Sequence, residues 1–236
     1  MKRTFKILAG LALLAALRVV SLAQTKEPAT LETVLKRMDA VAANFQTAQA
    51  DFVWDQYQKV VDETDTQKGT VYYRRAGKAG KDVEMMADIK QPDRKFVLYK
   101  DGKLQVYQPK IEQVMNYSPG GNKDELESFL VLGFGGSGQE LERSFEVTYQ
   151  GEETVENIPT AKLQLIPKSE KVRGNIPKIL LWIDLALGVS VQQQFMQAGG
   201  DYRLTKYSDI RIPAKIGNDV FRLKTTSKTQ FVSPRG

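Results

Sequence analysis

The chain has 236 residues, of which 42% are hydrophobic and 26% charged, and its formal net charge is +6. It contains no cysteine and no histidine. These two absences exclude disulfides, a lipid-modified cysteine, histidine ligands for zinc, and the serine–histidine and cysteine–histidine nucleophiles of many hydrolases. A β-rich chain of this length is by default one domain.

The first 23 residues have the pattern of a secretory signal peptide. A basic start precedes an apolar run over 7–17, and Ser21-Leu22-Ala23 is a small-x-small cleavage site. Because the run is shorter than the ~20 residues of a membrane-spanning helix, we expect cleavage before Gln24 rather than the alternative, an uncleaved anchor. We therefore expect residues 1–23 to be a signal peptide, 24–236 a single domain, and the periplasm of a Gram-negative-type envelope its location.

The charge of the mature chain is close to neutral. Residues 1–23 contain four basic residues and no acidic one, which leaves 30 basic and 28 acidic residues and a net charge near +2. This small excess removes most of the support for a nucleic-acid partner.

A helix is predicted over 30–45. Apolar residues recur there with helical spacing, at Leu31, Val34, Leu35, Met38, Val41, Ala42 and Phe45. Thr30 is a suitable N-cap. Such an apolar stripe packs against a core or covers a ligand cavity, and the sequence leaves both interpretations open.

Most of the remaining chain alternates apolar and polar residues, which predicts strands. The expected ranges are 50–61, 70–75, 83–90, 95–101, 104–108, 111–117, 145–150, 160–166, 178–184, 189–196, 202–212 and 220–226, with a polar turn over 62–68. Short turns join most of them, and Asp101-Gly102 is a tight-hairpin signal. Short connections favour antiparallel pairing, so we expect a mainly β fold with a curved sheet whose concave face is apolar.

A short helix over 124–132 is expected to form a lid. Leu126, Phe129 and Leu130 share one side of it, and a glycine-rich segment that contains Phe134 follows. Residues 133–138 match G-x-G-x-x-G literally. A dinucleotide site requires a preceding strand, a following helix and a βαβ unit, whereas here a helix precedes the segment and an antiparallel sheet surrounds it. A hinge for the lid is therefore the better interpretation.

The concave face is predicted to bind an apolar ligand. The candidate lining residues are Phe52, Trp54, Val71, Tyr73, Met85, Phe96, Leu98, Met115, Trp182 and Phe195. The alternative is that these side chains only fill a barrel interior. Flexible methionines suit a surface that adapts to varied apolar guests.

Arg74 and Arg75 end the strand predicted over 70–75. Because side chains alternate along a strand, one arginine points to each face. An arginine at the rim of an apolar pocket needs a partner, and the sequence does not decide which of the two it is.

The pattern resembles the LolA family of periplasmic lipoprotein carriers. The resemblance rests on 35–45 with Ala50-Asp51-Phe52, on Gly69 to Arg75, and most specifically on the hairpin Tyr99-Lys100-Asp101-Gly102 followed by Tyr107-Gln108-Pro109 and Glu112-Gln113. It implies an incomplete antiparallel β-barrel of about eleven strands, with the N-terminal helix and short lid helices on its concave side. It also implies that Arg75, or else Arg74, anchors the lid.

The resemblance further implies a function. The chain would shield the acyl chains of lipoproteins and move them from the inner to the outer membrane. Its partners would be acylated lipoproteins, an inner-membrane ABC-type releasing complex and an outer-membrane lipoprotein receptor. We expect a monomer that is not an enzyme, with no cofactor, metal or nucleic acid. The alternative is a periplasmic regulatory domain on the same scaffold that senses a lipid or a protein.

Overall fold

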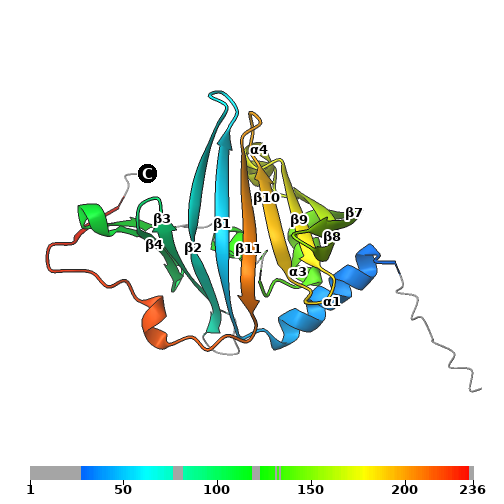
Figure 1. Ribbon diagram of the computed structural model, residues 1–236, viewed down its shortest axis with the longest axis horizontal. Coiled ribbons are helices and arrows are strands. Elements are labelled where there is room, and N and C mark those ends of the chain that lie inside the picture. Colours follow the sequence, from blue (N-terminus) through cyan, green and yellow to red (C-terminus); the bar gives the residue numbers. More distant parts are fainter. Residues whose placement is uncertain (1–27, 77–81, 119–122, 131, 133, 234–236) are drawn as a thin grey trace, which may run out of the picture.

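The computed structural model describes residues 28–76, 82–118, 123–130, 132 and 134–233. The predicted signal peptide, 1–23, lies outside this part of the chain. Over the described residues the fold consists of one large curved sheet with a few short helices (Figure 1).

Twelve strands of the described chain form a single open sheet. They are β1 (Thr47–Gln58), β2 (Glu63–Ala76), β3 (Asp82–Gln91), β4 (Lys95–Lys100), β5 (Lys103–Gln108), β6 (Gln113–Tyr117), β7 (Phe145–Val155), β8 (Ile158–Pro167), β9 (Lys178–Asp184), β10 (Ser190–Met196), β11 (Tyr202–Arg211) and β12 (Gln230–Val232). Their order is β12-β6-β5-β4-β3-β2-β1-β11-β10-β9-β8-β7. All pairs are antiparallel except β12 with β6. The prediction of a mainly β, incomplete antiparallel barrel is confirmed.

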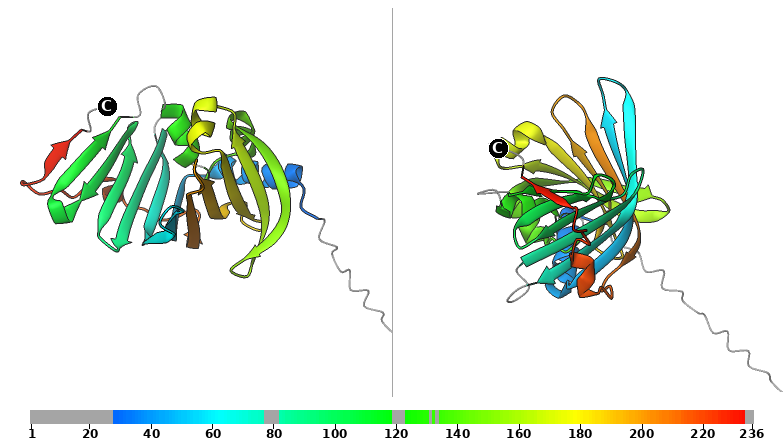
Figure 2. Two further views of the ribbon diagram at one scale, coloured as in Figure 1. Left: turned by 90° about the horizontal axis from the view of Figure 1, so that it is seen from above. Right: turned by 90° about the vertical axis from the view of Figure 1, so that its left-hand side faces the viewer.

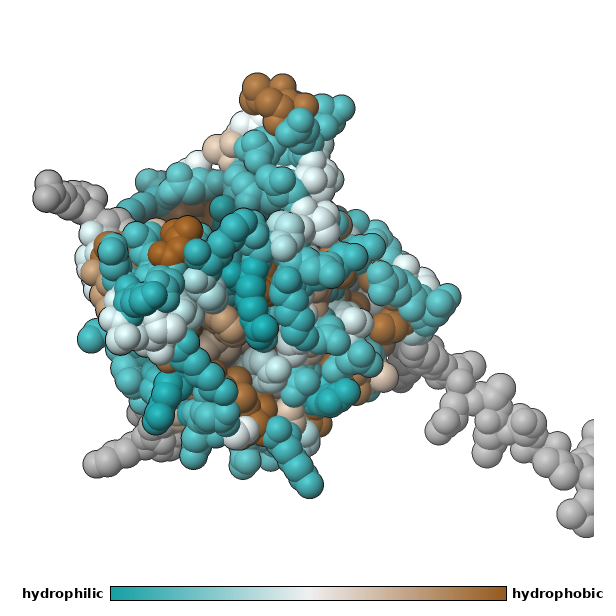
Figure 3. Space-filling model, turned by 60° about the vertical axis from the view of Figure 1, so that its left-hand side comes forward, coloured by the Kyte–Doolittle hydropathy of each residue, from teal (hydrophilic) through white to brown (hydrophobic). Residues whose placement is uncertain are grey.

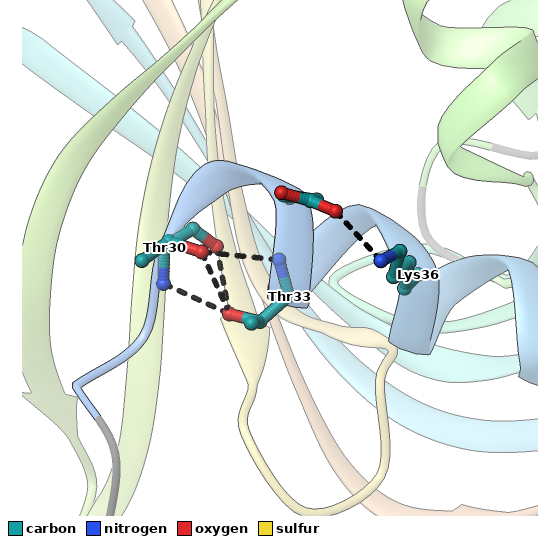
Figure 4. A network of polar contacts seen from close by, with 4 residues as sticks. Thr30, Thr33 and Lys36 are labelled. Atoms are coloured by element: carbon teal, nitrogen blue, oxygen red, sulfur yellow. Dashed lines mark hydrogen bonds and ion pairs between the residues drawn. The ribbon is translucent and has the colours of Figure 1, made fainter.

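The helices of the described chain are α1 (Leu31–Asn44), α2 (Lys123–Leu130), α3 (Gly138–Ser144) and α4 (Glu170–Asn175), with two 3-10 turns at 109–111 and 218–221. The predicted N-cap is confirmed, because the Thr30 side chain accepts a hydrogen bond from the Thr33 amide. Thr33 Oγ1 accepts one from the Thr30 amide in return, and both bonds are visible in Figure 4. This reciprocal box fixes where α1 begins.

We call the face of the sheet that α1 and α2 cover the inner face; the sheet bends around these helices (Figure 2). It carries two buried clusters. The first, the central cluster, consists of Phe45, Ala48, Ala50, Phe52, Val71, Tyr73, Met85, Ile89, Tyr99, Phe134 and Val189. The second, the α1 cluster, consists of Val34, Leu35, Met38, Leu132, Leu141, Phe145, Ala161, Leu163, Leu165, Ile179, Leu181 and Ile183.

The opposite, outer face is covered over β2 to β4 by the chain that follows β11. This segment crosses the sheet and returns as β12 beside β6 (Figure 1). Phe221, which is only 2% exposed, packs there against Met86 and Leu98. The prediction of a strand over 220–226 was wrong. These residues form an irregular segment that is not part of the sheet, and its apolar side chains are buried one at a time against the outer face.

The sequence prediction differs from the structure in other places too. The polar stretch 62–68 is not a turn, since β2 begins at Glu63 and pairs with β1 as far as Arg74. Both faces of this hairpin are polar, so the alternation that marks a strand is missing. The short elements α4 and β12 were not predicted at all.

The β1–β2 hairpin projects beyond its neighbours and ends in an apolar tip, seen as the brown patch at the top of Figure 3. Val60 is 96% exposed there, and Val61 is also exposed. The hairpin leans on the β10–β11 turn, because the Tyr57 ring stacks on Tyr202 and the Lys59 amide donates to Asp201. Among the described residues, no helix is both long and apolar enough to cross a membrane.

The cap of α1 gives a first testable prediction. Replacing Thr30 with alanine removes the side-chain oxygen that accepts from the Thr33 amide, while the amide of residue 30 can still donate to Thr33 Oγ1, so the free energy of unfolding should fall by about 1 kcal/mol. Urea unfolding followed by circular dichroism measures this loss. As a control, Lys36→Ala breaks only the exposed ion pair with Glu32 and should cost clearly less. Equal losses for the two variants would contradict the assigned cap.

Candidate functional site: the covered inner face of the sheet

The structure brings together five of the predicted lining residues with three of the predicted lid residues. Phe52, Val71, Tyr73 and Met85 belong to the central cluster and Trp54 packs against it. On the lid side, Phe134 is buried in the same cluster, and Leu126 and Leu130 of α2 pack on it. These side chains form the apolar centre of the inner face.

Two more predicted residues lie on the inner face beside the α1 cluster. Phe129 of α2 packs edge-on against Phe145, with ring centroids 5.9 Å apart, and lies 6.1 Å from the Phe195 ring. Met115 also lies on the inner face. It pairs with Val106, and Val106 pairs with Val97, which packs against the central cluster.

Three predicted lining residues lie on the outer face instead. Phe96 and Leu98 pack in the cluster around Phe221. The ring of Trp182 lies under the Lys162 ammonium, and its indole N–H donates to Glu153 Oε2 at 2.6 Å. In each strand an adjacent residue faces inward instead: Val97 after Phe96, Tyr99 after Leu98 and Leu181 before Trp182. The period of two was therefore assigned to the wrong face.

Phe134 fills the centre of the inner face. It is 1% exposed, and its ring centroid lies 5.2 Å from that of Tyr73 and 5.0 Å from that of Tyr207. The chain turns sharply behind it at Gly135, whose φ is +82°, and any side chain there would collide with the Phe45 ring. Phe134 is thus presented on a tight turn that is pressed against the end of α1.

Arg75 is the arginine that faces the lid. Its Nη2 donates to the Gly135 carbonyl oxygen at 2.7 Å and lies 3.9 Å from Glu140 Oε2. Arg74 points to the outer face, where it pairs with buried Glu84, donates to the Asn218 side chain and stacks on Phe221. The alternation of the strand therefore gives the two neighbouring arginines different partners.

An open recess of about 930 Å³ lies at the end of the sheet next to this contact. Its walls include Gln46, Arg75, Ser137 and Glu140. The contact of Arg75 with Gly135 therefore borders an open, solvent-accessible recess.

Two tyrosines of the inner face have perturbed acidities. Burial raises the pKa of Tyr73 to about 12, and the hydrogen bond with Tyr207 opposes that rise. Burial also raises the pKa of Tyr207 well above its ordinary value, and the neighbouring Tyr73 adds to the effect. The surroundings of Phe134 thus favour neutral, weakly polar groups.

The polar residues Ser137 and Glu140 form the N-terminal cap of α3. Ser137 Oγ accepts from the Glu140 amide as the N-cap of α3, and Glu140 accepts from the Ser137 amide. Within the described ranges no group of three or more acidic side chains is placed to hold a metal ion.

Sequence reasoning missed two polar residues of the inner face, Gln67 and Gln193. Gln193 pairs with Leu181 of the α1 cluster, lies two residues before the inward Phe195 on β10, and is 5% exposed. A polar residue at an inward position of an otherwise apolar series is a signal that the sequence alone does contain.

Comparisons with known proteins support the fold. The sequence matches no family model, and no curated protein matches it. Among solved structures it is similar to MucB, with a TM-score of 0.51 and 14% identity over 82% of this chain and 62% of that chain. A conserved protein from Thermus thermophilus has a TM-score of 0.53 and 11% identity over 86% of this chain and 98% of that one.

The structural neighbours also include a LolA superfamily protein from Nitrosomonas europaea, with a TM-score of 0.41 and 13% identity over 83% of this chain and 98% of that chain. MucB from Pseudomonas aeruginosa is also matched in its complex with MucA. The present chain spans about three fifths of the length of MucB. At such identities the likeness concerns the fold alone.

The Arg75 contact predicts a local effect. In Arg75→Leu the carbonyl of Gly135 loses a charged donor, so amide exchange of 134–136 should accelerate roughly ten- to hundredfold. Hydrogen exchange followed by mass spectrometry measures this. Arg74→Leu is the matched control, because it leaves buried Glu84 with Lys100 alone and should lower global stability without singling out 134–136. Unchanged exchange at 134–136 in Arg75→Leu would show that the contact does not hold the lid.

The tyrosine pair predicts alkaline sensitivity. A tyrosine whose pKa is higher in the folded than in the unfolded state contributes its full stabilisation of the fold below pH 10. This stabilisation is lost as the pH rises through 12. For Tyr73 the loss amounts to about 2–3 kcal/mol. Tyr73→Phe should therefore flatten the fall in stability between pH 10 and 12, measured by urea unfolding. Tyr117→Phe, which changes an exposed tyrosine, is the control, and equal slopes for both variants would rule out Tyr73 as the source.

Proposed function

We propose that the protein is a non-catalytic periplasmic carrier that shields the acyl chains of lipoproteins on the inner face of its sheet and moves them from the inner to the outer membrane. The observation that carries this proposal is the construction of the cover. The apolar centre is closed by α2 and by the single ring of Phe134, and this segment is tied to the sheet by Arg75.

Cargo can enter only if the cover moves. Phe134, Leu126 and Leu130 occupy the apolar surface that an alkyl chain would need. Displacing three such side chains costs about 2 kcal/mol each, whereas burying one 16-carbon chain yields on the order of 12 kcal/mol at 0.8 kcal/mol per CH₂. An acyl chain therefore competes with the lid, and a closed lid in turn favours release of the cargo.

The surroundings of the inner face fit a carrier better than an enzyme. The chain contains neither cysteine nor histidine, and the polar residues around the lid cap a helix or hold the turn in place. We propose an inner-membrane ABC-type complex as the donor and an outer-membrane lipoprotein receptor as the acceptor, with the carrier acting as a monomer.

A regulatory domain that binds a lipid or a segment of a membrane protein is the competing function, and the complex of MucB with MucA is its precedent on a similar fold. The two functions differ in the flow of cargo. Mixed with spheroplasts that hold newly made lipoproteins, a carrier that begins at Gln24 should release them in a soluble one-to-one complex. Binding without release into the soluble fraction would favour the regulatory function instead.

The lid helix provides the variant for this assay. Phe129→Asp places a charge among the rings of Phe145 and Phe195, so α2 should no longer close over the cargo and release should drop at least tenfold. The matched control is Phe231→Asp, because Phe231 is exposed on β12. Circular dichroism should show the same fold for both variants. Full release by a folded Phe129→Asp protein would contradict the role of α2 as a lid.

A further inference from the structure

The inner face changes from apolar to polar along its strands. Directly paired residues of antiparallel strands point to the same face, so Gln67, Trp54, Thr205 and Gln193 form one row across β2, β1, β11 and β10. The row on the central-cluster side contains Gly69, Phe52 and Tyr207. The row on the other side contains Asp65, Gln56 and Arg203, and on β10 it ends at apolar Phe195. We call the first of these rows the glutamine row. On β2, β1 and β11 it marks the border between apolar and polar surface.

Two side-chain atoms of the glutamine row are buried without a hydrogen-bond partner. They are Nε2 of Gln193, a donor, and Oε1 of Gln67, an acceptor. Gln193 is almost fully buried. Most buried polar atoms in proteins are paired, and an unpaired one lowers stability. Gln193 pairs with Leu181 of the α1 cluster, and Phe195, the next inward residue of β10, is also apolar, so an apolar side chain would suit this position better if it served only the core.

The free atoms define the chemistry of a ligand. Gln193 Nε2 can donate to a carbonyl oxygen, and Gln67 Oε1 can accept from an N–H or O–H group. The two residues are three strand spacings apart, roughly 14 Å along the sheet, so they would bind two different groups of the ligand. Trp54 lies between them, and the Arg203 guanidinium lies 5.7 Å from the centre of its ring on the polar side.

We propose that the glutamine row binds the ester and amide linkages that join acyl chains to a head group, while the chains themselves run over Phe52 into the central cluster. This inference rests on the proposed carrier function and adds to it a specificity for the linkage. Gln193 recognises a carbonyl oxygen of an acyl ester or amide, and Gln67 recognises the N–H of an acyl amide. The polar row with Arg203 then faces the head group or the peptide that follows.

The first test compares two probes that differ only in the linkage. One is a short peptide with a diacylglyceryl group on its N-terminal cysteine, and the other is its dialkyl ether counterpart with chains of equal length. The wild-type protein should bind the ester roughly three- to tenfold more tightly, because an ether oxygen is the poorer acceptor. Gln193→Leu should bind both probes as weakly as the wild type binds the ether.

The same strand offers a matched control. Gln194 is the next residue of β10 and points to the outer face, so Gln194→Leu should keep the preference for the ester. Gln193→Leu should also unfold at the wild-type temperature or above it, because no partner is lost. A marked loss of thermal stability in this variant would mean that the amide is used inside the protein, and it would overturn the inference.

The second test addresses Gln67 with an N-palmitoyl peptide and its N-methyl-N-palmitoyl counterpart, which lacks the N–H donor. The wild type should prefer the first probe, and Gln67→Leu should not. Equal preference in wild type and variants, in either test, would overturn the glutamine row and leave the carrier intact. Failure of the wild type to bind any of the four probes would overturn both proposals.

Discussion

An open sheet leaves its apolar face in contact with water unless other elements cover it, and the rest of this structure depends on that cover. Because β7 and β12 end the sheet without meeting, the inner face cannot be closed by the strands themselves. Instead α1, α2 and the ring of Phe134 cover it. The part of the cover formed by Phe134 is a single turn held by Arg75.

The two faces of the sheet are covered in different ways. On the outer face Glu84, only 6% exposed, is paired with both Arg74 and Lys100, and Phe221 seals the cluster beside it. Removing either cation leaves the buried carboxylate with fewer partners, which is costly. The contact of Arg75 with a backbone carbonyl borders an open recess and carries no such penalty.

Much of the fold could be predicted because local pattern and tertiary structure agree. The helix over 30–45 was predicted from its apolar spacing and Thr30 cap, and β9 and the Asp101-Gly102 hairpin from alternation and turn chemistry. The prediction of a turn over 62–68 was wrong because a hairpin that is polar on both faces lacks the alternation of a strand. The prediction of a strand over 220–226 was wrong because an irregular segment that covers a sheet can also alternate apolar and polar residues. The face of a strand is set by one residue of register, which is why Phe96, Leu98 and Trp182 were expected on the wrong side.

By itself the sequence determined the mainly β class, the amphipathic first helix and the lid segment with Phe134, because hydrophobic period and turn residues are local properties. It also restricted the chemistry through the absence of cysteine and histidine. Only the tertiary structure decided which arginine faces the lid, which aromatic residues point inward and where Gln67 and Gln193 align. Each of these depends on strand register and on contacts between residues far apart in the chain, and none of them is encoded in any short stretch of sequence.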